Sequence, residues 1–293
     1  MQLLNQILRG IVIGVANIIP GVSGGTMMVS MGIYDTLIHC ITHLFKEFRK
    51  SIMTLLPYGI GMVVGIIGLA SVLDWSFENF MLPTSTAFIG LILGGLSPLV
   101  AKVNFKKLDP VAVLLFIAFF GLIIFMGLQQ ETTDTGAALT IDVWQFLILI
   151  VMGCIASATM IIPGVSGSMV LMLLGYYHPV LNALSSLKDA VFALDFAAMA
   201  TPVLTLRPFG IGIVLGIFGV AKAIEWLLAR FEMHTYCSVL GLVLASPVAI
   251  LMGVGADAVN PVMVIVSVIT FALGFAAAWL LARGSKEGEA IKA

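Results

Sequence analysis

The chain has 293 residues, of which 60% are hydrophobic and only 10% are charged, and its mean hydropathy is +1.14. A soluble domain carries about 25% charged residues, so this composition excludes a water-soluble protein and indicates a polytopic membrane protein. The net charge of −1 excludes a nucleic-acid partner, because a nucleic-acid-binding protein needs a dense basic surface.

The sequence contains an internal repeat. The letters "IIPGVSG" occupy residues 18–24 and return unchanged at 161–167. Further along, "PYGIGMVVGIIGLASVLDW" at 57–75 matches "PFGIGIVLGIFGVAKAIEW" at 208–226. We therefore predict two repeats within a single integral membrane domain. The repeats are 1–128 and 143–283, joined by a polar linker at 129–142 and followed by a tail at 284–293.

Each repeat is predicted to open with a helix that breaks at Pro-Gly and returns as a second helix, which forms a re-entrant hairpin. Three apolar segments follow, and most of them are near the ~20 residues that span a bilayer. The fold class that we predict is an all-α polytopic membrane protein with two inverted-topology repeats, each a broken-helix hairpin plus three transmembrane helices. The six segments are 52–73, 85–101, 110–128, 207–228, 236–254 and 261–282.

The inverted relation follows from counting crossings. A hairpin returns to its starting side, so three spanning helices leave each repeat with an odd number of crossings. Basic residues favour the cytoplasmic side of a membrane, and most of them fall on one predicted side. The exceptions are Lys188 and Arg207. We therefore expect both termini in the cytoplasm.

The two Pro-Gly loops are the candidate binding site. A helix break within a membrane is tolerated only where it is buried in protein or lines a cavity. A helix N-terminus with nearby glycines and hydroxyls is suited to an anion, and secondary transporters place substrates between such broken helices. The alternative is that both loops only pack against neighbouring helices. The candidate residues are Pro20, Gly21, Ser23, Gly24, Gly25 and Thr26, with Pro163, Gly164, Ser166, Gly167 and Ser168.

These motifs also carry a family resemblance. The stretches "RGIVIGVANIIPGVSGGTMMVSMGIYDTLI", "IIPGVSGSMVLMLLGYYHPVL" and "GLVLASP" resemble the bacterial polyprenyl-phosphate transporter family over nearly the whole chain. The resemblance implies a protein of the bacterial inner membrane that transports undecaprenyl phosphate, the lipid carrier of cell-wall precursors, from the outer to the inner leaflet for reuse. It also implies that the loops hold the phosphate headgroup. Ser168 and Met169 stand where the first loop has Gly25 and Thr26, so the two half-sites are unequal.

Several polar residues outside the loops are further candidates for the headgroup or for ion coupling. Arg9 is interpreted as a side chain that snorkels at the inner interface, with phosphate binding as the alternative. Arg207 is either an outer-leaflet headgroup attractor or a helix-end cation. Asn17 stands three positions before the first loop proline.

Four ionisable residues complete this second group. Lys222 and Glu225 are three residues apart on one helix, so they either serve a function within the membrane or pair with each other. Asp35 and His178 occupy equivalent positions in the two repeats. They could titrate in a proton-coupled cycle or lie at the membrane interfaces.

A membrane phosphatase and a small-anion carrier are the competing functions. Hydrolysis needs an activated nucleophile, with a base and a cation nearby, and neither loop contains His, Arg or Glu. The three cysteines have no metal-ligand spacing. We therefore predict a transporter without catalytic residues, metal site or cofactor. The sequence leaves a homo-oligomer open.

Overall fold

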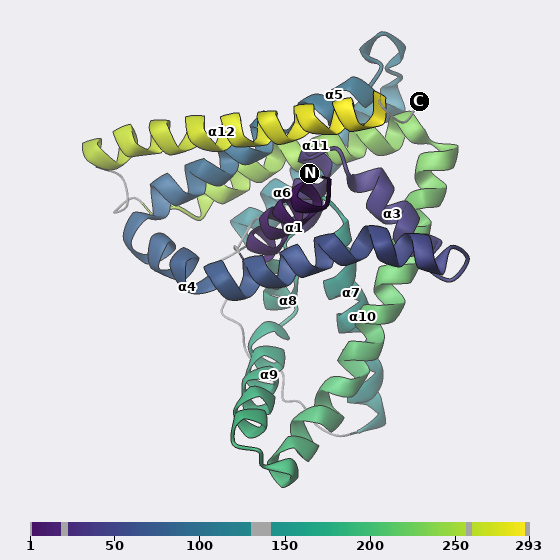
Figure 1. Cartoon of the computed structure of the whole chain (residues 1–293), viewed down its shortest axis with the longest axis vertical. Helices are drawn as coiled ribbons and strands as arrows, with labels where there is room; N and C mark the ends of the chain where they lie inside the picture. The colour runs from purple at the N-terminus through teal and green to yellow at the C-terminus, as the bar shows by residue number, and fades with distance from the viewer. Residues whose placement is uncertain (1, 19–22, 130–141, 256–259, 291–293) are drawn as a thin grey trace.

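The computed structural model describes residues 2–18, 23–129, 142–255 and 260–290, and all regular structure in these ranges is helical (Figure 1). Pro20, Gly21 and residues 130–141 of the expected linker lie outside the described residues. The helices are α1 (Gln2–Ile18), α2 (Gly24–Ser30), α3 (Tyr34–Thr42), α4 (Phe48–Gly94), α5 (Ser97–Lys102), η1 (Phe105–Lys107), α6 (Pro110–Leu128), α7 (Val143–Ile161), α8 (Gly167–Leu173), α9 (Tyr177–Phe192), α10 (Phe196–Arg230), α11 (Glu232–Met252) and α12 (Pro261–Ala290).

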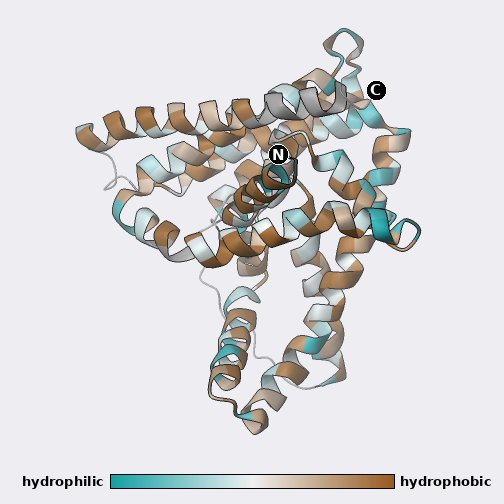
Figure 2. Ribbon diagram, viewed as in Figure 1, coloured by the Kyte–Doolittle hydropathy of each residue, from teal (hydrophilic) through white to brown (hydrophobic). Residues whose placement is uncertain are grey.

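The outer surface of the long helices is apolar. Within the described residues, seven segments are long and apolar enough to cross a membrane. Hydrophobic residues dominate these helices (Figure 2), and many point outward; Ile67 on α4, for example, is 77% exposed. Such faces require lipid, because water does not solvate them favourably. The predicted fold class, an all-α polytopic membrane protein, is therefore confirmed.

The apolar segments of the first half are joined more directly than the sequence indicated. Residues 74–84, which separate the predicted segments 52–73 and 85–101, continue as helix within α4, with one non-helical residue at Phe80. Pro83 explains the kink, because a proline inside a helix removes a hydrogen bond and its ring collides with the carbonyl four residues earlier. The Thr84 hydroxyl donates to the Ser76 carbonyl across the kink, at 3.1 Å.

Glycines bring two pairs of helices into close contact. Where α1 crosses α4, a Cβ added to Gly61 would collide with the carbonyl of Ile7 and would approach Gly10. The equivalent helices of the second half, α7 and α10, meet in the same way at Gly153 and Gly212. Backbones can approach this closely only where a side chain is missing. The glycine pattern of the sequence thus marks helix–helix interfaces.

The last helix of each half packs against the other half of the chain. α6 packs on α11, where Gly241 faces the Phe116 backbone, and α12 packs on α4, where Gly274 faces Ala87. The side chain of Asp109 caps α6 by accepting from the Ala112 N–H at 2.8 Å, and it also bonds to His234 of α11. The last helix of each half therefore packs on the other half of the same chain, and this packing joins the two halves.

The close helix crossings lead to a first prediction. Gly212→Ala should destabilise the protein by about 1–3 kcal/mol, because the added methyl group overpacks the α7–α10 contact. Gly210→Ala is the matched control, since a Cβ at Gly210 meets no atom within 4 Å. Thermal unfolding of the two purified variants in detergent measures the difference. Equal melting temperatures would contradict this packing.

Candidate functional site

The two Pro-Gly loops, 143 residues apart in the sequence, contact each other in the structure. The Gly164 N–H donates to the Thr26 hydroxyl at 2.7 Å, and the Ser23 hydroxyl donates to the Ile162 carbonyl at 3.3 Å. Thr26 is fully buried and Ser23 is 3% exposed. Each loop therefore supplies polar partners to the other at a point where both helices are interrupted.

The N–H groups at the start of α2 already have partners in the protein. Ser23 is the N-cap residue, and its hydroxyl accepts from the Gly25 N–H at 3.2 Å. The Asn17 side-chain carbonyl accepts from the Gly24 N–H at 3.1 Å. This loop was expected to offer its N–H groups to an anion, whereas in the structure these two N–H groups bind side chains of the first hairpin.

At three loop glycines the space that a side chain would occupy is already filled by other protein atoms. An added Cβ would lie 2.6 Å from the Asn17 side chain at Gly24 and 2.7 Å from the Ile161 carbonyl at Gly25. Gly164 has a φ of +83° and faces the Leu242 carbonyl, so it combines a left-handed backbone with close packing. These glycines allow the two loops and α11 to approach one another.

The second loop differs from the first at its serines. Ser166 is the N-cap residue of α8, but its hydroxyl lies 2.9 Å from that of Ser168. In such a pair one hydroxyl donates and the other accepts, and each hydroxyl carries a single proton. The accepting hydroxyl therefore keeps its own proton for a further acceptor. The two loops are thus unequal, as predicted: the Ser23 hydroxyl caps its helix, whereas the Ser166 hydroxyl pairs with that of Ser168.

A cavity of about 280 Å³ adjoins the two loops. Polar side chains gather around the second loop, and the remaining wall comes from apolar residues of α7, α8, α9 and α10. No charged residue is among the described residues that line it. The polar lining consists of Asn17, Ser23, Ser157, Thr159, Ser166, Ser168 and Tyr177, and the apolar lining includes Met160, Val165, Leu171, Val180, Leu181, Leu184, Phe209 and Ile213.

Three of the predicted polar candidates lie away from this cavity. Arg9 is only 6% exposed and lies close to Tyr58 of α4, so the interpretation as a snorkelling side chain is wrong. The reason is the close α1–α4 crossing, which encloses the side chain in protein. Arg207 on α10 and His178 on α9 are exposed, and neither lines the cavity.

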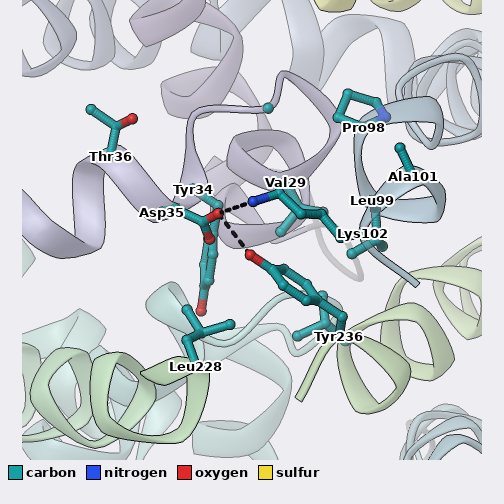
Figure 3. Close-up of a pocket in the computed structure, with 12 residues that line it drawn as sticks. Val29, Tyr34, Asp35, Thr36, Pro98, Leu99, Ala101, Lys102, Leu228 and Tyr236 are labelled. Carbon is teal, nitrogen blue, oxygen red and sulfur yellow. Dashed lines mark hydrogen bonds and ion pairs between the residues drawn. The ribbon is translucent and has the colours of Figure 1, made fainter. Parts of the chain in front are cut away.

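Asp35 lies at a second cavity, also of about 280 Å³. Its carboxylate accepts a hydrogen bond from the Tyr236 hydroxyl at 2.7 Å and pairs with Lys102 at 3.4 Å (Figure 3). The Lys102 ammonium also lies 5.5 Å from the centre of the Tyr236 ring. The structure thus places Asp35 in a polar cluster between α3, α5 and α11, separate from its sequence counterpart His178.

Glu225 contacts two histidines that the sequence interpretation did not select. Its carboxylate lies 3.2 Å from His39 and 3.3 Å from His43. Among the described ion pairs none joins Glu225 to Lys222. The available signal was the spacing "HCITH", which places two imidazoles on one face of a helix. Nothing in the sequence pointed to their acidic partner on α10.

Comparison with known proteins decides the family. A model of the undecaprenyl phosphate translocase-like family matches residues 13–264, a range that contains both loops. The chain belongs to this family. It is 30% identical to a polyprenyl-phosphate transporter of Staphylococcus aureus, over 97% of this chain and 98% of that protein. A polyprenyl-phosphate transporter of Vibrio cholerae is 29% identical, over 84% and 77% of the two chains. No solved structure matches this member of the family.

The loop–loop contact gives a second prediction. Thr26→Val in this translocase-like protein keeps the shape of the side chain but leaves the buried Gly164 N–H without its acceptor, which costs about 1–3 kcal/mol. We expect a lower melting temperature in detergent. Thr26→Ser retains the hydroxyl and should lose less. If valine and serine gave the same stability, the hydrogen bond would not be what holds the loops together.

Proposed function

We propose that this protein transports undecaprenyl phosphate from the outer to the inner leaflet of the bacterial cytoplasmic membrane, so that the carrier is reused in cell-wall polymer synthesis. Its family and the names of its two relatives support a polyprenyl-phosphate transporter. The direction of transport, the leaflet and the use in cell-wall synthesis belong to the proposal.

The main observation behind the proposal is that the loop cavity has a polar wall at the loops and an apolar wall from the surrounding helices. A polyprenyl phosphate has a charged head and an apolar chain. In the Ser166–Ser168 pair one hydroxyl proton is left for a further acceptor. The Asn17 oxygen accepts from the Gly24 N–H, and among the described residues no acceptor is recorded for the Asn17 NH₂ group. Phosphate oxygens accept such bonds. The apolar side chains of α9 and α10 then contact the first part of the lipid chain.

This assignment differs in emphasis from the site that the sequence suggested, in which both loops hold the phosphate headgroup. In the proposal the headgroup binds mainly to the second loop, because the first loop uses Ser23 and Thr26 to hold its partner. Ser23 still lines the cavity, so a change of its hydrogen bonds could admit it to the site. In this proposal the loops bind the substrate and also hold each other in place through hydrogen bonds.

The same lining favours transport over hydrolysis. A serine nucleophile needs a base that removes its proton, and none of the described lining residues is His, Asp, Glu, Lys, Arg or Cys. Hydroxyl and amide donors can bind a phosphate and release it unchanged. The large apolar wall favours a lipid over a small inorganic anion, which would gain nothing from it.

The proposed orientation is that residues 46–50 and 102–107 and both termini face the cytoplasm, while residues 129–142 face outward. It follows from the basic residues of the first two segments. A single cysteine introduced at Thr133, in a chain with its own three cysteines replaced, should react with a membrane-impermeant thiol reagent on intact cells. A cysteine at Lys106 should react only after the cells are opened. The reverse pattern would overturn the orientation.

The headgroup assignment gives a further prediction. Ser166→Ala and Ser168→Ala should each weaken binding of undecaprenyl phosphate by about tenfold to a hundredfold, because a hydrogen bond to a charged group contributes about 1.5–3 kcal/mol. Ser186→Ala, an exposed serine on α9, is the matched control and should bind like the wild type. The measurement is lipid binding to purified variants of matched melting temperature.

Transport is tested in the same preparation. Reconstituted protein should move labelled undecaprenyl phosphate between leaflets without releasing inorganic phosphate, and excess inorganic phosphate should compete weakly. Phosphate release that depended on Ser166 would favour a phosphatase. Undiminished binding in both serine variants would remove the loop cavity as the headgroup site.

A further inference from the structure

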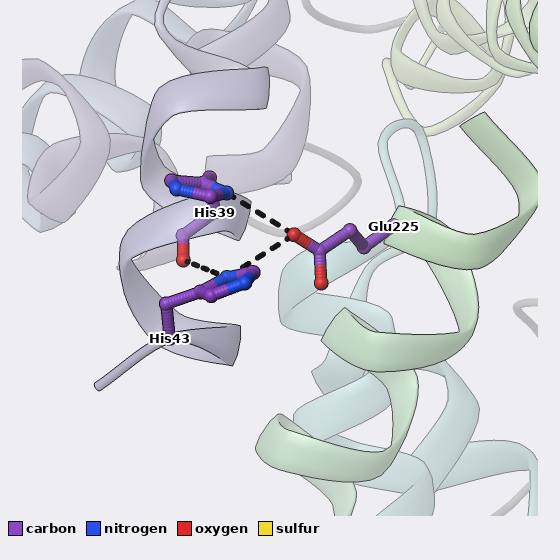
Figure 4. Close-up of side chains that lie close together, drawn as sticks. All are labelled: His39, His43 and Glu225. Carbon is purple, nitrogen blue, oxygen red and sulfur yellow. Dashed lines mark hydrogen bonds and ion pairs between the residues drawn. The ribbon is translucent and has the colours of Figure 1, made fainter. Parts of the chain in front are cut away.

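Two histidines of α3 and one glutamate of α10 form a compact cluster outside the loop cavity. His39 and His43 are four residues apart, and their rings lie side by side with centroids 4.1 Å apart. The nearest oxygen of Glu225 lies 3.2 Å from the His39 Nδ1 and 3.3 Å from the His43 Nδ1 (Figure 4). The three side chains thus converge from two helices on one small space.

The spacing of these atoms matches that of metal ligands. Zinc binds imidazole nitrogen and carboxylate oxygen at about 2.0–2.1 Å in a tetrahedral arrangement, which sets neighbouring ligand atoms about 3.3 Å apart. The two nitrogen–oxygen distances equal this value within 0.1 Å, and one ligand atom from each residue fits within a 4.8 Å span. Two histidines and one glutamate form a known three-ligand set that leaves the fourth position open.

The surroundings also favour a cation. His43 is the C-cap residue of α3, and the C-terminal end of a helix carries partial negative charge. The carboxylate of Glu47 follows one turn later; Lys50 binds it at 2.9 Å. Lys50 first, and then the nearby His39 and His43, hold the pKa of the Glu47 carboxyl below its usual range.

We propose that His39, His43 and Glu225 bind one divalent transition-metal ion, with Zn²⁺ as the natural probe. Imidazole nitrogen and a single carboxylate select such an ion over Ca²⁺ or Mg²⁺, which prefer oxygen ligands. The ion would connect α3 of the first half to α10 of the second. The proposal departs from the sequence expectation of no metal site, and it does not depend on which substrate the protein carries.

Hydrogen bonds are the competing explanation for the cluster. The His43 Nδ1 also lies 3.0 Å from the Thr42 hydroxyl and 3.2 Å from the His39 carbonyl. A proton on each Nδ1 could therefore link the imidazoles to Glu225 without any ion. A cluster held by hydrogen bonds alone would not bind a metal ion. A measurement of metal binding to the purified protein therefore distinguishes the two explanations.

The experiment measures Zn²⁺ binding to the full chain in detergent, after removal of any affinity tag, by calorimetry and by the visible spectrum of bound Co²⁺. We expect one Zn²⁺ per chain and a higher melting temperature that a chelator reverses. Changing even an outer partner of a metal ligand costs about 10- to 100-fold in affinity. His39→Gln, His43→Gln and Glu225→Gln should therefore each lose at least about 100-fold. His178→Gln, an exposed histidine elsewhere, should bind like the wild type.

A second measurement needs no variant. X-ray absorption of the Zn²⁺-loaded protein should show nitrogen and oxygen neighbours at about 2.0–2.1 Å, with two imidazoles. Sulfur at about 2.3 Å would assign the ion to a cysteine and overturn the proposal. It would equally be overturned by a wild-type protein that binds no Zn²⁺, or by cluster variants that bind it as well as His178→Gln does.

Discussion

The hydrogen bond from the Gly164 N–H to the Thr26 hydroxyl joins the two Pro-Gly loops, and the candidate site is built around this contact. A broken helix exposes backbone groups that a membrane interior cannot solvate. In this protein each interrupted helix finds partners in the other, and the Ser23 hydroxyl adds a second link to the Ile162 carbonyl. The breaks can therefore lie inside the protein, next to a cavity that faces the second loop.

The exchange of the last helices reinforces this arrangement. Because α6 packs on α11 and α12 packs on α4, a rearrangement of either half must move a helix that belongs to the other. The close contacts at Gly241 and Gly274 involve backbone atoms, so no side chain separates the two helices of each pair at these points. A transporter built in this way couples its two halves through covalent connections as well as through packing.

Hydroxyl groups and two of the charged clusters occupy different places in the structure. The loop cavity is lined by hydroxyl and amide groups, whereas the clusters around Asp35 and Glu225 both involve α3 and its C-cap His43. Asp35 connects α3 to α5 and α11 through Lys102 and Tyr236, and His39 and His43 connect it to Glu225 of α10. α3 follows directly on the first loop and the seven residues of α2, so contacts that fix α3 also position that loop. An ion at the histidines would add a further constraint on the same helix.

The sequence by itself determined the membrane class and the paired loops. These features depend on hydropathy and on neighbours a few residues away, so a local pattern records them. Tertiary structure decided that Arg9 is buried and that α6 and α12 each pack on the opposite half. It also decided that the Ser23 and Thr26 hydroxyls bond to the second loop. The pairing of Glu225 with His39, 186 positions away, was decided in the same way. Contacts of that range depend on how helices cross, and the periodicity of one helix shows which face is apolar but not which helix covers it.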